Sequence, residues 1–564
     1  MYILGISCFY HDSAACLLKD GLIVAAAEEE RFSRKKHDFS FPAKTVNFCL
    51  ERASITSSDI DHVVFYEKPL IKFERLLYTF LSTYPHSYNV FLKSMPIWLK
   101  EKLHIGDIIK KELKYKGRIL FVTHHQSHAS SAFLASEYKD AAILTTDAAG
   151  EWSTTSLGKG EDTQVDILKE VHFPHSLGLF YSAITAFLGF KVNNDEYKVM
   201  GLAPYGTPSY YERLADIVKV KDDGSYKLDM RYFDYHKKMR MYSSKLVKAF
   251  GKPRKPESEL SQRDKDLAAS AQKLLEDILL KMVNHLYEIT GKKKLCIAGG
   301  VALNCVANGR LLRESPFEDI FVQPAAGDAG GALGAAYYVY NTLLKKPRAA
   351  AMNSVYLGPD FSNQEVQSFL DESHIKYEKL DWPQLNKIVA KKLSDTEIVG
   401  WFQGRMEIGP RALGNRSILA NPSLPEMKDI LNRKIKFRES FRPFAPVVLY
   451  EFMNEYFETD RESPFMLFTV KVKEDCRAKI PAVTHLDGSA RVQTLKESQN
   501  QHLYQLLHEF YRITNLPVLI NTSFNVRGEP IVCTPQDAYK CFLKSGLDAL
   551  VINNYLIVKE KGIS

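Results

Sequence analysis

The sequence predicts an α/β protein of several domains whose N-terminal part contains two related lobes. Its 564 residues exceed what one hydrophobic core accommodates, so two to four domains are expected. The first thirty residues indicate three short strands around the polar turn FYHDS, and a similar strand, acidic turn and strand return at 141–158. Because this hairpin is used twice, we expect two α/β lobes that face a cleft.

Two insertions interrupt this pattern. Residues 68–115 carry aromatic side chains at roughly helical spacing and indicate an inserted helical layer, for which core packing is the simpler interpretation. Residues 225–265 are rich in Lys, Arg and Tyr and indicate a solvated excursion before a long helix that begins near Asp264. Both insertions therefore add elements to the N-terminal part without changing its α/β fold class.

A linker separates this part from the rest of the chain. Pro, Gly and small residues gather near 345–362, and the stretches that follow again alternate strands with helices. The C-terminal part is therefore also expected to be α/β. We predict an N-terminal domain at 1–345, a linker at 346–362 and a C-terminal domain at 363–564.

The composition is that of a cytoplasmic enzyme. Lys and Arg total 75 and Asp and Glu 67, so the net charge of +8 is small for this length and gives no indication of nucleic acid. No apolar run is long enough to span a membrane, and the first residues lack the basic start and cleavage site of a signal peptide. The eight scattered cysteines form no CxxC pair and are expected to be buried thiols.

The stretch THHQSHA is the first candidate site. Its threonine and the glutamine three positions later fit a capping box, which would place His124 and His128 at i and i+4 on one helical face. Such a pair can bind a divalent ion or simply pack at a helix start. The Gly-flanked acids Asp147 and Asp328 could complete a shell, and a mixed N/O set suits iron, manganese or zinc.

Two further motifs are candidates for a nucleotide site. The Gly-Gly turn within 293–312 follows an apolar strand and could present backbone N–H groups to a nucleotide, or could be an ordinary tight connection. The stretch 193–206 fits ribose or phosphate binding and an exposed ion pair equally well. The candidate nucleotide-binding residues are Glu196, Lys198, Gly299, Gly300, Asn304 and Gly327.

The C-terminal part is dense in anion-binding candidates within short motifs rich in Gly, Pro and Asn. Guanidinium forks suit phosphate, whereas a nucleic-acid surface would more typically show a Lys/Arg stripe with interleaved aromatic residues. A surface ion pair is the simpler interpretation for any single arginine, but less so for the whole set. The set comprises Arg405, Arg411, Arg416, Lys436, Arg438, Arg442, His485, Arg491, Asn521, Ser523, Asn525 and Arg527.

Long motifs along the whole chain resemble one family. GISCFYHDSAACLLKDGLIVAAAEEERFSRKKH, HHQSHA, EYKVMGLAPYG, GGVALN and GDAGGALGAA, in this order, resemble the NodU/CmcH O-carbamoyltransferases. The resemblance implies an N-terminal domain of the actin, sugar-kinase and chaperone-ATPase type, which is ribonuclease H-like. The K-x-R and S-x-N patterns, formed by Lys436 with Arg438 and Ser523 with Asn525, resemble YrdC-like domains, which bind ATP and activate a one-carbon acid.

The resemblance also implies roles for individual residues. His124, His128, Asp147 and Asp328 match a metal set that would hold Fe²⁺, with Mn²⁺ or Zn²⁺ as alternatives. His11 matches a histidine beside the acceptor hydroxyl, and Lys36 a lysine near the activated carbamoyl group. The matching donor-site positions are Arg411, Lys436, Arg442, Arg491 and Ser523, with Asn521, Arg527 and His485 as further members.

The implied reaction uses ATP, accompanied by Mg²⁺, and carbamoyl phosphate. These form carbamoyladenylate, whose carbamoyl group passes to a hydroxyl of a small-molecule natural product or sugar, with no nucleic acid or membrane as partner. A threonylcarbamoyl-tRNA-type enzyme, a kinase-like ATPase and a nucleotide sensor are the alternatives. The sequence leaves the acceptor, the metal and a homodimeric state open.

Overall fold

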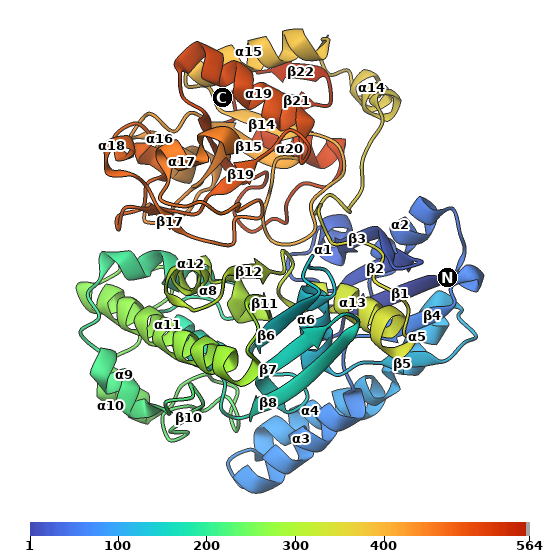
Figure 1. Ribbon diagram of the computed structural model, residues 1–564, viewed down its shortest axis with the longest axis vertical. Coiled ribbons are helices and arrows are strands. Elements are labelled where there is room, and N and C mark those ends of the chain that lie inside the picture. Colours follow the sequence, from blue (N-terminus) through green and yellow to red (C-terminus); the bar gives the residue numbers. More distant parts are fainter. Residues whose placement is uncertain (560–564) are drawn as a thin grey trace. The chain divides into compact units, whose positions relative to one another are not determined.

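The computed structural model describes residues 1–559, which fall into two compact units, as Figure 1 shows. The first unit contains residues 1–29 and 39–352, and the second contains residues 30–38 and the chain from Asn353 onward. The division after Met352 lies inside the segment where the sequence indicates a linker. The sequence does not indicate that residues 30–38 belong to the second unit.

The first lobe is built on a five-stranded sheet with the order β3-β2-β1-β4-β5. The first three strands form an antiparallel meander, and β4 and β5 continue the sheet parallel to β1. The strands are β1 (Tyr2–Ser7), β2 (Ala14–Lys19), β3 (Leu22–Glu28), β4 (His62–Phe65) and β5 (Ile119–Phe121). Its helices are α2 (Ala43–Ala53), α3 (Pro69–Thr83), α4 (Tyr88–Lys100) and α5 (Ile105–Leu113), the last three of which confirm the predicted helical insertion.

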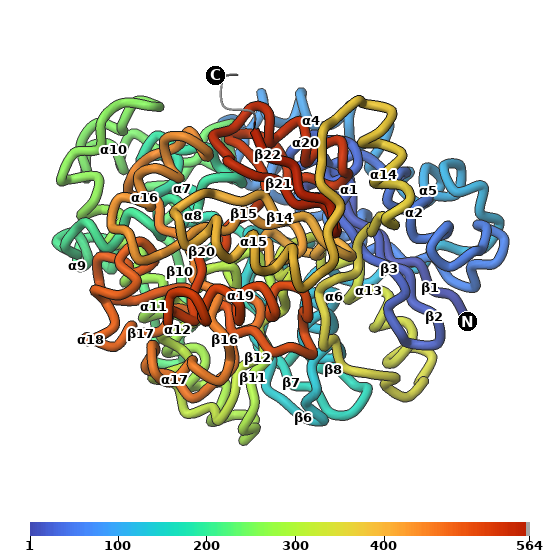
Figure 2. The backbone as a smooth tube through the Cα atoms, turned by 90° about the horizontal axis from the view of Figure 1, so that it is seen from above, coloured from blue at the N-terminus to red at the C-terminus, as the bar shows by residue number. Residues whose placement is uncertain are grey.

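The second lobe repeats this topology. Its sheet has the order β8-β7-β6-β11-β12, again an antiparallel meander followed by two parallel strands. The strands are β6 (Asp140–Thr146), β7 (Ser153–Glu161), β8 (Gln164–His172), β11 (Lys294–Ala298) and β12 (Asp319–Val322). Figure 2 shows β6, β7 and β8 running side by side. The duplicated hairpin is therefore confirmed, together with the predicted fold of actin, sugar kinases and chaperone ATPases.

Helices α6 and α13 pack against each other in the middle of the first unit. Small residues permit this close approach, since a Cβ at Gly334 of α13 would lie 1.8 Å from the carbonyl oxygen of Ser127. Helix α13 also packs on the strands β1 and β2 of the first lobe. The helices are α6 (His124–Phe133), α7 (Leu177–Phe187), α8 (Glu196–Leu202), α9 (Tyr211–Ile217), α10 (Ser244–Phe250), α11 (Gln262–Thr290), α12 (Cys305–Glu314) and α13 (Asp328–Tyr337), and a small ribbon joins β9 (Val218–Val220) to β10 (Tyr226–Leu228).

The second insertion differs from its prediction. It carries β10 and α10 and buries Phe233 completely, so it is a folded layer and only partly a solvated excursion. The sequence pattern misleads because the charged residues of this segment surround one buried acid: Asp234 is paired with Arg240 at 2.8 Å. Helix α11 follows as predicted, capped by a reciprocal Ser261 and Asp264 box.

The second unit is an eight-stranded mixed sheet with the order β13-β22-β21-β14-β15-β20-β16-β19, which confirms the predicted α/β class. Trp401 lies fully buried in its core. The strands are β13 (Glu378–Lys379), β14 (Val399–Phe402), β15 (Arg416–Ala420), β16 (Ala445–Leu449), β19 (Gln493–Leu495), β20 (Val518–Ser523), β21 (Ala549–Ile552) and β22 (Tyr555–Val558), with a separate pair β17 (Val470–Lys471) and β18 (Ser489–Ala490). The helices are α14 (Asn363–Glu372), α15 (Trp382–Ser394), α16 (Met427–Ile430), α17 (Met453–Tyr456), α18 (Glu474–Arg477), α19 (Gln501–Thr514) and α20 (Pro535–Lys544).

Two arginines hold the segment 30–38 within this unit. Helix α1 (Glu29–Ser33) buries Arg31, whose Nη2 donates to the carbonyl of Gly409 at 2.9 Å. Arg34 donates to the carbonyls of Ile531 at 2.7 Å and Pro530 at 2.9 Å. These charge-assisted bonds explain why a short N-terminal segment belongs to the C-terminal fold.

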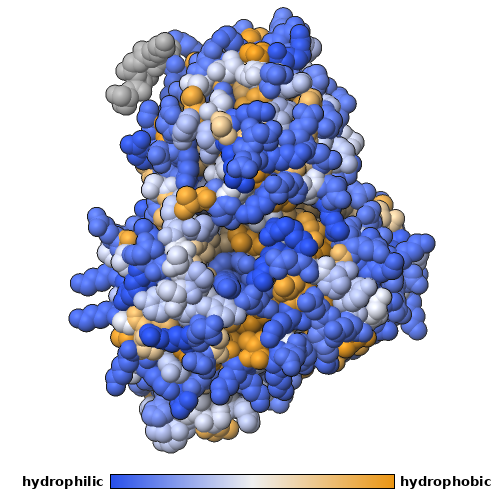
Figure 3. All heavy atoms as spheres, turned by 60° about the vertical axis from the view of Figure 1, so that its left-hand side comes forward, coloured by the Kyte–Doolittle hydropathy of each residue, from blue (hydrophilic) through white to orange (hydrophobic). Residues whose placement is uncertain are grey.

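The surface seen in Figure 3 is mainly hydrophilic, with apolar residues in small groups. Within residues 1–559, no helix combines the length and apolarity needed to cross a bilayer. All eight cysteines are buried and unpaired, which confirms the expectation of buried thiols.

Candidate active site

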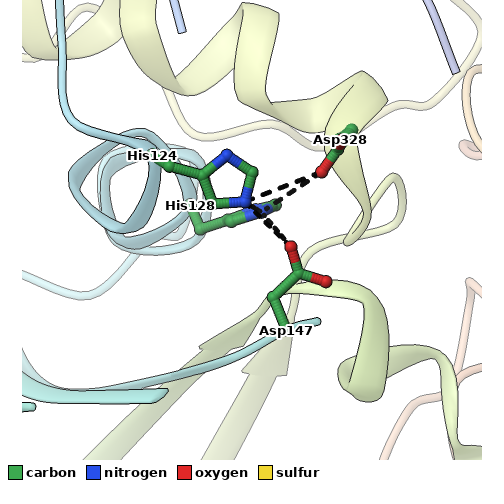
Figure 4. A group of neighbouring side chains, drawn as sticks. All are labelled: His124, His128, Asp147 and Asp328. Atoms are coloured by element: carbon green, nitrogen blue, oxygen red, sulfur yellow. Dashed lines mark hydrogen bonds and ion pairs between the residues drawn. The ribbon is translucent and has the colours of Figure 1, made fainter. Parts of the chain in front are cut away.

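Four side chains of the first unit converge on one point, as Figure 4 shows. His124 and His128 come from the first two turns of α6, Asp147 directly follows β6, and Asp328 opens α13. The Nε2 atom of His124 lies 2.8 Å from Oδ2 of Asp147 and 3.1 Å from Nε2 of His128. Both Nε2 atoms lie 3.7 Å from Oδ1 of Asp328. One ligand atom of each residue thus falls within 4.8 Å of the others.

The charges of this cluster fit a cation. Burial alone would raise the pKa of the Asp147 carboxyl, but hydrogen bonds to His124 and His128 hold it well below its usual range. Burial lowers the pKa of His128, yet its bonds to Asp147 and Asp328 raise it to about 9. Two imidazole nitrogens and two carboxylate oxygens therefore surround one point, which a divalent metal would fill. Two nitrogen and two oxygen donors suit iron, manganese or zinc.

The predicted helix start is confirmed, but its predicted capping box is wrong. Thr123 is the N-cap residue and makes no side-chain bond to the helix, while the side chain of Gln126 donates to the carbonyl of Val165 at 2.8 Å. Instead, both carboxylate oxygens of Glu151 lie 3.1 Å from the backbone N of His124. A buried carboxylate at this helix end stabilises the partial positive charge of the N-terminus better than a hydroxyl does. It thereby fixes where His124 begins the helix.

A buried ionic layer behind the cluster was missed by sequence reasoning. Glu67, at the end of β4, is fully buried, and its Oε2 lies 2.6 Å from Nζ of Lys72 in α3. The same oxygen lies 3.9 Å from Nδ1 of His124. The neighbouring Tyr66 hydroxyl donates to Oδ2 of Asp328 at 3.2 Å. The helical insertion therefore supplies charged support for the cluster as well as core packing.

His11 lies in the first turn of the first lobe with both ring nitrogens facing acceptors. Its Nδ1 is 2.8 Å from Oδ2 of Asp12, and its Nε2 is 3.0 Å from the carbonyl oxygen of Asn193. Burial lowers the pKa of His11. The hydrogen bond and the charge of Asp12, with smaller effects from Asp328 and Asn193, raise it by more, so that the pKa is about 9. In this arrangement His11 is a proton donor at neutral pH. Lys36 is exposed, in segment 30–38 of the second unit.

The Gly-Gly turn lies directly on the cluster. Gly299 has a φ of +93°, and a Cβ there would meet the carbonyl oxygen of Thr146 at 2.3 Å, so only glycine fits. The N–H of Gly300 donates to Oδ1 of Asp147 at 3.1 Å. Asn304 caps α12 through the N–H of Ala307. Gly327, just before α13, faces open space.

Glu196 and Lys198 have local structural partners. Glu196 accepts hydrogen bonds from Ser182 at 2.8 Å and from the N–H of Asn193 at 2.9 Å, so it fixes the turn whose carbonyl contacts His11. Lys198 is buried, and its Nζ lies 3.2 Å from Oδ2 of Asp195. The exposed ion pair considered from the sequence is therefore wrong, because Lys198 pairs with a different acid inside the fold.

In the second unit, the K-x-R and S-x-N motifs meet. The Nζ of Lys436 donates to the backbone carbonyls of Ser523 and Asn525, the second at 2.9 Å, and to the side-chain oxygen of Asn525 at 3.0 Å. Burial lowers the pKa of Lys436 well below its usual range, and the charges of Arg438 and Arg442 lower it further. Lys436 thus joins the two motifs through its N–H donors, and the neighbouring charges of Arg438 and Arg442 make this position suited to an anionic ligand.

Other predicted donor-site residues lie around the same sheet. Burial lowers the pKa of His485 to about 4. The charge of Arg491 lowers it as well, whereas the charge of Asp487 raises it. Within residues 1–559, the buried Nε of Arg491 and Oδ1 of Asn521 have no hydrogen-bond partner. Buried polar atoms normally have a partner, which a bound ligand would supply here. Arg411 and Arg442 are half-buried and Arg527 is exposed, while Arg438 donates to Asn432 at 2.7 Å.

Two arginines of the predicted set are structural. Arg416 is fully buried, donates to the carbonyls of Gly404 and Pro359, each at 3.0 Å, and stacks on Phe402. Arg405 donates to the carbonyl of Gly358 at 3.1 Å. Backbone oxygens take both terminal nitrogens of Arg416 and the Nε of Arg405, so these contacts do not support the expectation that the two arginines bind an anion.

The fold and the cluster define a two-lobed α/β enzyme of the actin, sugar-kinase and ATPase type, joined to a second α/β unit. The chain belongs to the carbamoyltransferase family of the NodU/CmcH type. The family model described as carbamoyltransferase N-terminus matches residues 2–337 of the sequence. The family model described as carbamoyltransferase C-terminus matches residues 390–559. The protein is thus a transferase.

Relatives of known sequence cover nearly all of the chain. An uncharacterized protein of Synechocystis is 49% identical over 99% of this chain and 97% of that protein. The nodulation protein NolNO of Sinorhizobium fredii is 42% identical over 98% of this chain and 79% of that protein. Among solved structures, (R)-2-hydroxyglutaryl-CoA dehydratase component A of Acidaminococcus fermentans is 15% identical, over 61% of this chain and 99% of its own, with a TM-score of 0.32.

Proposed function

We propose that the protein is an ATP-dependent O-carbamoyltransferase that acts in the cytoplasm on a hydroxyl of a small natural product or sugar. The main observation behind this proposal is the cluster of four potential metal ligands, His124, His128, Asp147 and Asp328. The backbone N–H of Gly300, in the candidate nucleotide-binding turn, donates to Asp147, so the turn and the potential metal ligands lie together. The second unit adds a cationic site around Lys436 that is suited to phosphates.

The donor half-reaction belongs to the second unit in this proposal. Hydrolysis of carbamoyl phosphate releases phosphate and carbamate, whose oxygen attacks the α-phosphorus of ATP, so that carbamoyladenylate forms and pyrophosphate leaves. Lys436, Arg442 and Arg491 would stabilise the negative charge that gathers on the phosphoryl oxygens, with Mg²⁺ bound to ATP. Lys436 is buried, so its charge would act there more strongly than in water.

The transfer half-reaction belongs to the His/Asp cluster. The acceptor hydroxyl attacks the carbonyl carbon of carbamoyladenylate, AMP leaves, and the hydroxyl proton goes to a base. A divalent metal held by the two histidines and two aspartates, with Fe²⁺ favoured and Mn²⁺ or Zn²⁺ as alternatives, supplies Lewis-acid polarisation there. His11 can serve as the base only in its neutral form, and Lys36 is the proposed cation near the carbamoyl group.

Pyrophosphate release from ATP, with no acceptor present, tests this proposal. Release that requires carbamoyl phosphate and falls at least tenfold in Arg442→Ala, but not in the exposed control Arg512→Ala on α19, would support it. Release that depends on threonine and bicarbonate instead would favour the tRNA-type reaction. Formation of ADP and phosphate would favour a kinase-like ATPase, and binding of ATP without turnover a nucleotide sensor.

A further inference from the structure

The turn that carries His11 has an unusual backbone. It joins β1 to β2 and contains Phe9 with φ +75° and Asp12 with φ +39°, both in the left-handed region that favours glycine. A bulky residue such as phenylalanine keeps such an angle only where the surrounding structure fixes it. Contacts from outside the turn therefore hold His11, which lies between these two residues, in its place.

Lys102 supplies one of these contacts from the helical insertion. It lies in the short 3₁₀ helix Lys102–His104 between α4 and α5, and its Nζ donates to the backbone carbonyl of Phe9. The N–H of Phe9 donates to the carbonyl oxygen of Phe39 at 2.6 Å. Both backbone polar groups of Phe9 are therefore bonded to segments that are distant in the sequence, and these bonds fix the left-handed angle of this residue.

Tyr10 is anchored in the insertion by its ring. The Nζ atoms of Lys72 and Lys102 lie 3.5 Å and 4.3 Å from the centroid of this ring. Ammonium groups at such distances are attracted to the electron-rich face of an aromatic ring. Tyr10 also packs against a small apolar cluster whose other members all lie within residues 73–103. The residue next to His11 is thus part of the core of the insertion.

The same insertion also reaches the His/Asp cluster. Lys72 of α3 pairs with Glu67 at 2.6 Å, and Oε2 of Glu67 lies 3.9 Å from Nδ1 of His124. The charge of Asp328 contributes to the raised pKa of His11, so the turn is near enough to the cluster for their charges to interact. The insertion therefore connects the turn of the proposed base with a proposed metal ligand.

We propose that Lys102 and Tyr10 are positioning residues for His11, through which the helical insertion holds this imidazole in place as the base for the acceptor hydroxyl. Neither side chain exchanges a proton in the reaction. The inference rests on the proposed function, because it takes His11 as the base of carbamoyl transfer. It gives the insertion, residues 69–113, a role beyond core packing, which is to set the place of the base relative to the metal ligands.

NMR titration of the full chain with ring-labelled histidine tests the inference, and His11→Gln assigns the His11 signal. Tyr10→Leu removes the ring face without changing any charge. It should lower the midpoint of His11 from about 9, by roughly half a pH unit or more, because the hydrogen bond to Asp12 depends on the shape of the turn. Tyr10→Phe keeps the ring face and should titrate as the wild type does.

Lys102→Met separates positioning from a direct effect of charge. Loss of a nearby cation by itself can only raise the midpoint of His11, whereas release of the turn should lower it by roughly half a pH unit. Lys102→Arg keeps the charge and the N–H donors and should restore most of the wild-type value. Lys100→Met, at an exposed position at the end of α4, is the control and should leave the midpoint unchanged.

Three results would each overturn the inference. The first is an unchanged midpoint in Tyr10→Leu together with an unchanged or raised midpoint in Lys102→Met. The second is a lowered midpoint that Tyr10→Phe and Lys102→Arg share. The third is an equal disturbance of distant histidines such as His285 in α11, which would indicate general loss of structure.

Acceptor-free pyrophosphate release by the wild-type protein is measured separately. If this release fails while the midpoints of His11 move as expected, the proposed function is wrong, but the positioning of His11 by the insertion stands. If release requires carbamoyl phosphate while the midpoints do not move, the proposed function stands and the positioning role is wrong.

Discussion

Glu67 directs its Oε2 atom at Nδ1 of His124 from 3.9 Å, and both side chains are buried. Within the described chain, Nδ1 of His124 has no hydrogen-bond partner. The separation is too long for a hydrogen bond, so Glu67 acts on His124 through its charge: a carboxylate near Nδ1 favours the tautomer that carries its proton there, which leaves the Nε2 lone pair for the metal. Nε2 is the atom that faces Asp147, His128 and Asp328.

Glu67→Gln should therefore weaken metal binding without removing a ligand. Replacing a carboxylate partner of a ligating histidine typically costs roughly tenfold to 100-fold in affinity. The affinity for Mn²⁺ or Zn²⁺ is measured by competition with a chelator. Glu74→Gln, an exposed glutamate of α3, is the control and should bind metal as the wild type does. Equal affinity in Glu67→Gln would remove the orienting role from Glu67.

His11 should titrate near pH 9 in the folded protein. Its raised pKa means that the protonated form dominates at neutral pH, and that its pairing with Asp12 contributes stability below the unfolded-state pKa, which is lost as the pH rises through about 9. Asp12→Asn removes the carboxylate and should move the titration to lower pH. The measurement is an NMR titration of labelled histidines, with His11→Gln used to assign the signal. A midpoint near 6.5 in the wild type would contradict the structure.

The same shift sets the pH dependence of transfer if His11 is the base. Because only neutral imidazole accepts a proton, the transfer rate should rise with pH up to about 9, and Asp12→Asn should displace that rise to lower pH. Acceptor-free pyrophosphate release should not follow this profile. A transfer rate that falls between pH 7 and 9 would assign the base role to another group.

Lys436→Met should abolish most of the adenylate-forming activity. The change removes a buried cation and the bonds that join it to Ser523 and Asn525, and loss of one such charge-stabilising donor typically costs roughly 10²–10³-fold in rate. Pyrophosphate release measures the effect, with the exposed Lys434→Met as control. As the pH rises, a lysine with a lowered pKa loses its positive charge earlier than an ordinary lysine. Binding of the phosphate substrates should therefore begin to weaken at a lower pH than an ordinary lysine would give. Unchanged release in Lys436→Met would exclude this site.

Local patterns explain how much of this structure the sequence predicts. The two meanders follow from alternation within each strand, and the four-residue cluster from an i, i+4 pair with two Gly-flanked acids. The capping carboxylate Glu151 was missed because it lies 27 residues from His124 and no periodicity links them. The carbonyl that Arg31 contacts is 378 residues away, so residues 30–38 could not be assigned to the second unit.

Arg416 shows a different limit, since a motif rich in arginine does not distinguish an anion ligand from a buried structural group. Burial lowers the pKa of Arg416 to about 10, and its guanidinium bonds to several backbone carbonyls. Arg416→Met leaves these carbonyls unpaired and should destabilise the second unit by about 3 kcal/mol. Arg416→Lys should restore only part of this loss, because an ammonium cannot reproduce the planar fork.

Calorimetry of the full chain measures this loss as a lower midpoint for one unfolding transition, with the exposed Arg433→Met as control. At a temperature where Arg416→Met stays folded, its carbamoyl-phosphate-dependent pyrophosphate release should remain within about twofold of the wild type, because the guanidinium faces backbone oxygens and not a ligand. The opposite pair of results, an unchanged midpoint with release lost, would restore Arg416 to the anion-binding set that the sequence indicates. The two measurements together therefore separate a structural arginine from a binding one.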